Sequence, residues 1–347
     1  AVTTAFASSL SLAVILTVYG YFFSRNMMEW IHTPQNIMQD GVLYLKIYVF
    51  GLIFLMLYNV CTGIFTALGD SRTPLWFLLG SSAGNIALDL LFVAVLPWGI
   101  AGAAFATVIA QYVSGIGITI YVLHSCKDLL PGKEELCFDR GILGEIVNLS
   151  SLTCLQQSVM NFGILMVQGL VNSFGATVMA AFAAAVKIDT FAYLPVQDFG
   201  NAFSTFVAQN YGAGNQERIR KGTRVAFAMS IGFSVMISVL VCLFAGPLMK
   251  IFVSGKEVAV IAAGVKYLRI EGAFYLGIGC LFLLYGYYRA IKRAEMSVVL
   301  TVISLGLRVL LAYVLSVVFG EVGIWVAIPI GWVMADVTGI VYMRRTW

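Results

Sequence analysis

Apolar residues fill this chain in long runs that short polar segments separate. Most runs reach about 20 residues, the length that an α-helix needs to cross the hydrocarbon core of a bilayer. They do not alternate between polar and apolar positions, as the strands of a membrane β-barrel would. The pattern therefore predicts an all-α, multi-pass membrane protein.

The breaks between the runs predict ten helices. Gly and Pro mark many of these breaks, such as Pro97 with Gly99. The expected helices cover about residues 1–23, 41–67, 74–96, 99–124, 141–172, 176–209, 221–246, 261–288, 294–319 and 322–343. We therefore expect an incomplete N-terminal bundle of four helices over 1–125, a cytoplasmic linker over 126–140 and a C-terminal bundle of six helices over 141–347.

The composition agrees with a membrane protein. Hydrophobic residues make up 60% of the chain and charged residues 11%, whereas a soluble domain has about 25% charged residues. Soluble, nucleic-acid-binding and disulfide-stapled proteins are therefore excluded. The six cysteines are scattered, without a Cys-x-x-Cys pair or a His/Cys cluster, so the sequence predicts no metal site.

The Lys and Arg residues between the expected helices are distributed unevenly. Thirteen fall on one side of the membrane and three on the other. The larger group is Arg72, Lys127, Lys133, Arg140, Arg218, Arg220, Lys221, Arg224, Arg289, Lys292, Arg293, Arg344 and Arg345. The smaller group is Arg25, Lys250 and Lys256. Positive residues accumulate in cytoplasmic loops, so we expect both ends of the chain to face the cytoplasm.

One seven-residue phrase occurs twice in the chain. GVLYLKI at 41–47 returns as GVKYLRI at 264–270, at an offset of 223 residues. Further identities at this offset pair Gly63 with Gly286, Ala67 with Ala290, Ser81 with Ser304 and Val95 with Val318. The two copies lie six expected spans apart, and an even number of spans gives them the same orientation. Such parallel repeats are typical of transporters built from two helical bundles.

The repeat also allows the lengths of the two bundles to be compared. At this offset residue 1 corresponds to Arg224, so the counterparts of the helices over 141–172 and 176–209 would precede Ala1. We therefore expect the chain to be a fragment of a protein with six plus six helices, and the alternative is a protein with ten helices.

Several segments resemble one transporter family. In the first half they are ALGDSRTPLWF at 67–77, NIALDLLFV at 85–93 and WGIAGAAFATVIAQ at 98–111. In the second half they are LQQSVMNFG at 155–163, VNSFGATVMAAFAAAVKID at 171–189 and QNYGAGNQERI at 209–219. Together they make essentially the whole chain similar to the MATE family, the multidrug and toxic compound extrusion transporters.

The resemblance implies a two-lobe antiporter of twelve helices, of which the first two are absent from this sequence. It implies alternating-access export of cationic, amphipathic molecules in exchange for Na⁺ or H⁺, with no other cofactor and no enzymatic activity. The expected location is the bacterial plasma membrane. The expected partners are small organic cations and the lipid bilayer, with no nucleic acid, and we expect a monomer.

The sequence departs from the family pattern in two respects that concern ion coupling. In this family a carboxylate in the first helix usually serves coupling, and the resemblance implies that this helix is absent here. Some members have a Glu in the seventh helix, where this chain has Gln156 and Gln157. The choice between Na⁺ and H⁺ therefore stays open.

The expected helix over 176–209 carries charged residues within the membrane, where such residues need a partner or a water-filled cavity. At 100° per residue, Lys187 and Asp198 lie on nearly the same face, and Asn201 continues it. Asp189 points almost oppositely from Lys187. A transport or coupling role for Lys187, Asp189 or Asp198 competes with a buried structural network that fixes the helix packing.

A second polar stripe follows the neighbouring helix over 141–172. It consists of Gln157, Asn161 and Gln168. Polar stripes on these two helices would face one another across a cavity in the second bundle.

Other polar residues lie inside the expected spans. Asp89 and Asn85, one turn apart, are candidates for an ion or proton site in the first bundle, and the alternative is a role in helix packing. Arg308 corresponds to Asn85 in the repeat and could counter a buried carboxylate. Asp336 lies late in the last helix, where we expect water to solvate it. Candidates for an aromatic site that attracts cations are Tyr58, Tyr193, Tyr275 and Tyr285.

Three other functions are alternatives to the antiporter. A flippase for lipid-linked oligosaccharides on a related fold would need a strongly basic central cavity, and few cations lie within the expected spans. A membrane enzyme would need clustered His, Cys or carboxylates, and the two histidines, His32 and His124, are isolated. A non-transporting membrane scaffold is the remaining alternative.

Overall fold

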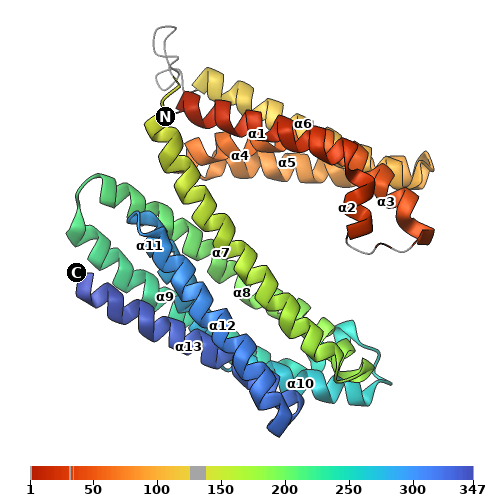
Figure 1. The fold of residues 1–347 in the computed structure, drawn as a ribbon, viewed down its shortest axis with the longest axis vertical. Helices are drawn as coiled ribbons and strands as arrows, with labels where there is room; N and C mark the ends of the chain where they lie inside the picture. The colour runs from red at the N-terminus through yellow and green to blue at the C-terminus, as the bar shows by residue number, and fades with distance from the viewer. Residues whose placement is uncertain (1, 31–32, 34, 126–137, 347) are drawn as a thin grey trace. The chain divides into compact units, whose positions relative to one another are not determined.

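The computed structural model describes residues 2–30, 33, 35–125 and 138–346. Within these ranges the chain is helical and contains no strand, which confirms the all-α prediction (Figure 1). Most of the expected linker over 126–140 lies outside the described residues. The chain divides into two compact units, Ala1–Val147 and Asn148–Trp347.

Nine helical segments within the described ranges are long and apolar enough to cross a bilayer. A tenth span is formed if the bent pair Val258–Gly272 and Tyr275–Ala290 is counted as one. This matches the ten spans that the hydrophobic pattern predicts, and the chain is a multi-pass membrane protein.

In unit 1, most of the other helices pack against α6 (Gly99–Ser125). The preceding elements are α1 (Val2–Phe22), α2 (Ser24–Trp30), α3 (Gln35–Tyr48), the 3₁₀ turn η1 (Val49–Gly51), α4 (Leu52–Ala67), α5 (Arg72–Asp89) and the π-helix η2 (Leu90–Val95). Cys61 and Phe65 of α4 pack against Ile118 and Val122 of α6. The span expected over 41–67 thus begins earlier, at Gln35, and contains the turn η1.

The turn before α5 is held by Asp70. Its Oδ1 accepts hydrogen bonds from the backbone N–H groups of Arg72 (2.9 Å) and Thr73 (3.1 Å). Its Oδ2 accepts one from the Thr73 hydroxyl (2.6 Å). The first N–H groups of a helix have no partner within the helix, so the carboxylate supplies one. The hydrogen bond from the Thr73 side chain, above all, lowers the pKa of Asp70.

The substitution Asp70→Ala is expected to lower the thermal unfolding midpoint of the detergent-purified protein at pH 7. Because the pKa of Asp70 is lowered in the folded state, its stabilisation is present above the unfolded pKa of about 4 and fades as the pH falls further. The difference between the variant and the wild type should therefore shrink in scans below about pH 4. A difference that stays the same at both pH values would contradict this role of the carboxylate.

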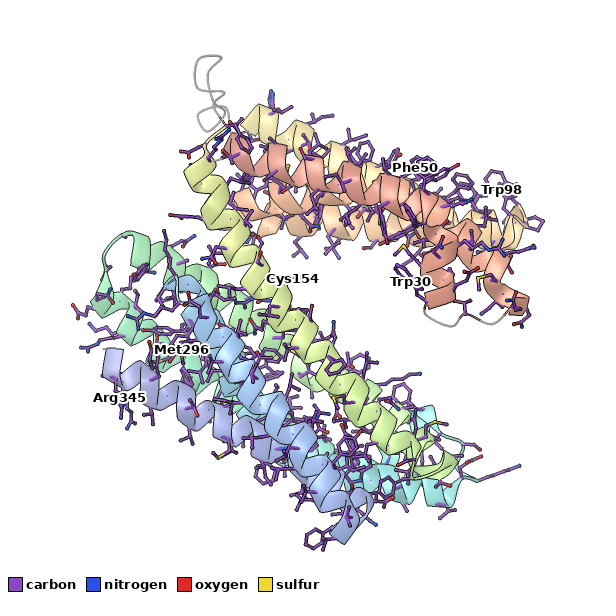
Figure 2. The ribbon with its side chains drawn as sticks, in the orientation of Figure 1. Trp30, Phe50, Trp98, Cys154, Met296 and Arg345 are labelled. Carbon is purple, nitrogen blue, oxygen red and sulfur yellow. The ribbon has the colours of Figure 1, made fainter. Side chains whose placement is uncertain are left out.

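Unit 2 contains the longer helices. They are α7 (Arg140–Asn172, whose first eight residues belong to unit 1), α8 (Ala176–Gly212), α9 (Gln216–Phe252), α10 (Val258–Gly272), α11 (Tyr275–Ala290), α12 (Ala294–Phe319) and α13 (Glu321–Thr346). Figure 2 shows their side chains, with Cys154 labelled on α7 and Met296 near the start of α12. The centre of the unit is α11, which packs against α8, α9, α12 and α13 and is buried along most of its length.

The helix expected over 261–288 is broken in the structure. Its halves, α10 and α11, meet at an angle of 51°. Phe274 leaves the helical region there (φ −114°, ψ 16°). The backbone N–H of Phe274 donates to the Glu271 carbonyl oxygen (2.9 Å), and the N–H of Gly277 donates to the Phe274 carbonyl oxygen (2.8 Å). The break places a helix end and a helix start inside unit 2.

Candidate functional site

Unit 2 encloses a cavity of about 360 Å³ beside the break between α10 and α11. Side chains from α7, α8, α10, α11, α12 and α13 line it. The α7 wall contributes three polar side chains, Gln157, Asn161 and Gln168, next to two apolar ones. The other walls are largely aromatic and aliphatic. This mixture of a mostly apolar lining with a few polar groups is typical of small-molecule sites.

Three lining residues carry formal charge: Asp189 of α8, Glu271 of α10 and Arg308 of α12. Asp189 and Glu271 are 4% and 6% exposed. The Tyr275 hydroxyl donates a hydrogen bond to Asp189 Oδ1. The other oxygens, Asp189 Oδ2 and Glu271 Oε2, are buried and have no hydrogen-bond partner among the described residues.

The helical spacing explains how these groups come together. Tyr267 and Glu271 are four residues apart, which places them on one side of α10, and Tyr275 follows directly after the break. All three line the cavity. Arg308 of α12 lines the same cavity as both carboxylates.

Aromatic rings support the cavity wall near the carboxylates. Phe182 stacks on Trp325 with 5.4 Å between ring centroids, and Tyr267 meets Trp325 edge to face at 4.9 Å. Tyr193 and Phe282 stack at 6.4 Å on the lining as well. Aromatic faces next to carboxylates suit an organic cation, because ring faces attract positive charge.

The predicted candidates divide between the cavity and other places. Asp189, Arg308, Gln157, Asn161 and Gln168 line the cavity. The aromatic candidates on its wall are Tyr193, Tyr275 and Tyr285. The α7 stripe and Asp189 of α8 thus line one cavity, whereas the predicted α8 stripe of Lys187, Asp198 and Asn201 does not.

Lys187, Asp198 and Asn201 do not line this cavity. Lys187 is exposed, with its Nζ 6.0 Å from the centre of the Phe252 ring. Asp198 is exposed on the same face of α8, as the helical phase predicts. Asn201 Oδ1 accepts a hydrogen bond from Arg289 Nη2 (3.0 Å) beside a pocket of about 40 Å³.

The first-bundle candidates lie at the end of α5. Asp89 is the last residue of α5, and the π-helix η2 follows it directly. Both Asp89 and Asn85 are half-buried. Asp89 Oδ1 and Asn85 Nδ2 have no hydrogen-bond partner within the described part of the chain. Tyr58, also in unit 1, donates to the Pro74 carbonyl oxygen (3.1 Å).

Glu271 and Tyr267 were not among the residues predicted from the sequence. Glu271 directly follows the repeated phrase GVKYLRI, and the matching position of the first copy is Tyr48. A carboxylate inside an apolar run was the available signal. Asp336 also differs from expectation, because it is 9% exposed rather than solvated.

Comparison with known proteins gives three concordant findings. Residues 1–91 and 152–314 match the sequence model of the family described as MatE. Over 331 residues the chain is 30% identical to the probable multidrug resistance protein YpnP of Bacillus subtilis, covering 94% of this chain and 72% of that protein. Over 297 residues it is 25% identical to the probable multidrug resistance protein NorM of Thermotoga maritima, covering 82% and 62%.

Solved structures share the fold. A MATE protein in complex with MaL6 has a TM-score of 0.92 at 22% identity, covering 99% of this chain and 78% of that chain. A MATE family multidrug resistance transporter in an outward-facing conformation has a TM-score of 0.92 at 21% identity, with the same coverage.

Proposed function

The chain belongs to the MatE family, and from that premise we propose that it is a secondary active antiporter, which exports cationic, amphipathic compounds in exchange for Na⁺ or H⁺. As a member of a transporter family it is not an enzyme. The relatives named above are called multidrug resistance proteins, while another, from Shewanella oneidensis, is called an FAD transporter. Because relatives differ in this way, the chemistry of the cavity carries the proposal.

The observation that carries it is the pair of buried carboxylates, Asp189 and Glu271, on one cavity of a membrane-spanning unit. Ionised groups inside a membrane are costly and commonly mark ion and substrate pathways. Each carboxylate keeps one oxygen without a partner among the described residues. A proton, a sodium ion or the positive group of a drug can satisfy such an oxygen.

Antiport follows if these cations exclude one another. A drug that occupies the carboxylates leaves when a proton or Na⁺ neutralises them, and the ion leaves when a new drug binds. Coupling also requires that the cavity opens to one side of the membrane at a time, as in transporters with two repeated bundles. We propose the bacterial plasma membrane as the location, with the Lys- and Arg-rich loops on the cytoplasmic side.

The cavity also separates this proposal from the flippase alternative. A flippase for lipid-linked oligosaccharides would require a basic cavity to bind phosphate groups. The cavity of unit 2 has two carboxyl groups and one guanidinium on its lining. This composition favours a cationic substrate.

The proposal is tested in everted membrane vesicles from bacterial cells that express the protein. We expect the vesicles to accumulate ethidium, an aromatic cation, when either Na⁺ or H⁺ is more concentrated inside than outside. Applying the two gradients separately identifies the coupling ion. Vesicles from cells without the protein are the control, and equal accumulation in both preparations under both gradients would contradict the proposal.

A further inference from the structure

The charges on the cavity of unit 2 do not balance. Asp189 and Glu271 contribute two negative charges when ionised, and Arg308 contributes one positive charge. The lining residues among the described part of the chain include no other side chain with formal charge. When both carboxylates are ionised, the sum of the charges on the cavity lining is therefore one negative charge. We propose that Arg308 sets this sum and thereby restricts the cavity to one positive charge at a time.

The position of Arg308 supports a role as a fixed charge in the cavity. No ion pair within 4.0 Å joins it to either carboxylate or to another acid in the described ranges. Its Nε atom is buried and has no hydrogen-bond partner there. It nevertheless lines the same cavity as both Asp189 and Glu271. Arg308 thus offsets part of the negative charge of the two carboxylates without occupying their oxygen atoms in an ion pair.

The restriction follows from the low dielectric of a membrane interior. A single positive charge brings the cavity to neutrality. A second one would remain uncompensated and would be repelled by the guanidinium. At an effective dielectric constant of about 20, two unit charges about 10 Å apart interact strongly enough to change an affinity by about tenfold. The preferred substrates are therefore monovalent aromatic cations, and one proton or one Na⁺ is enough to replace each of them.

This inference rests on the proposed function and deepens it by naming the valence of the substrate. Two dyes with the same ring system provide the test. Ethidium carries one positive charge, and propidium carries a second one on its side chain. Binding of each dye to the detergent-purified protein is measured by the change in dye fluorescence. The quantity of interest is the ratio of the two dissociation constants in each variant.

We expect the wild type to bind ethidium at least about tenfold more tightly than propidium. The substitution Arg308→Gln leaves two negative charges in the cavity, so propidium binding should improve by about tenfold relative to ethidium binding. Arg308→Lys keeps the charge and should keep the wild-type ratio. Arg269→Gln is the matched control, because it removes a guanidinium from an exposed position two residues before Glu271. Its ratio should equal that of the wild type.

The outcomes distinguish a failure of the valence restriction from a failure of the proposed function. A folded Arg308→Gln variant with the wild-type ratio overturns the valence restriction alone. The same conclusion follows if Arg269→Gln shifts the ratio as much as Arg308→Gln does. If the wild type neither binds ethidium nor accumulates it in vesicles, the proposed function itself is wrong, and the valence restriction fails with it.

Discussion

Replacing Asp189 by Asn is expected to reduce ion-driven ethidium accumulation in everted vesicles by at least about tenfold. Asn has nearly the same shape and can still accept the hydrogen bond from Tyr275, but it has no charge to exchange between a drug and an ion. Glu271→Gln should have a similar effect, because its carboxylate lies on the same cavity. Initial rates under separate Na⁺ and H⁺ gradients measure the loss.

The matched control for this prediction is Asp198→Asn. Asp198 lies on the same helix, nine residues after Asp189, but it is exposed and does not line the cavity. It should therefore transport at nearly the wild-type rate. If Asp198→Asn stops transport and Asp189→Asn does not, the coupling site lies on the other face of α8, and the assignment to the cavity is wrong.

This contrast also shows how much of the candidate site can be predicted from the sequence. The helical phase alone separates Asp189 from Lys187 and Asp198, and the structure agrees with that separation. The phase does not say which face turns toward the interior of the unit. That depends on which helices pack around α8, and their positions are not encoded locally. All three residues are therefore candidates from the sequence, and only Asp189 lines the cavity.

Glu271 illustrates a second limit. The repeat identified the span that carries it, but the repeat compares each position with the other copy, where Tyr48 stands. A residue that differs between the copies gives no signal in such a comparison. The break after Glu271 was not predicted either, because no Pro lies between Gly272 and Tyr275. The position of the break depends on how α10 and α11 pack within unit 2, and the sequence alone does not show it.

Asp336 shows the same limit for depth in the membrane. Counted along α13, it lies ten residues before the end of the helix, which suggested contact with water. In the structure it faces α11, where a Cβ atom on Gly277 would come within 3.6 Å of its Oδ2. Burial here depends on the neighbouring helix and not on the distance to the helix end.

The second large effect is expected from Gly286→Ala, at the contact between α8 and α11. A Cβ atom at Gly286 would overlap the carbonyl oxygen of Gly200, and one at Gly200 would lie 2.8 Å from the Phe282 carbonyl oxygen. Backbone atoms cannot rotate away as side chains do, so the two helices must separate. Overpacking of this kind costs about 1–3 kcal/mol, which should lower the unfolding temperature of the purified protein by several degrees.

The separation should also weaken ethidium binding, because the two helices carry facing walls of the cavity, with Asp189 on α8 and Tyr275 on α11. Gly232→Ala on α9 is the matched control, since a Cβ atom there meets no described atom within 4 Å. It should leave binding unchanged and stabilise the helix slightly, as alanine favours helices more than glycine does. If Gly286→Ala unfolds at the wild-type temperature and binds ethidium normally, the close approach of α8 and α11 is not what shapes the site. Weaker binding without a loss of stability would instead show that the contact positions the cavity walls and contributes little to folding.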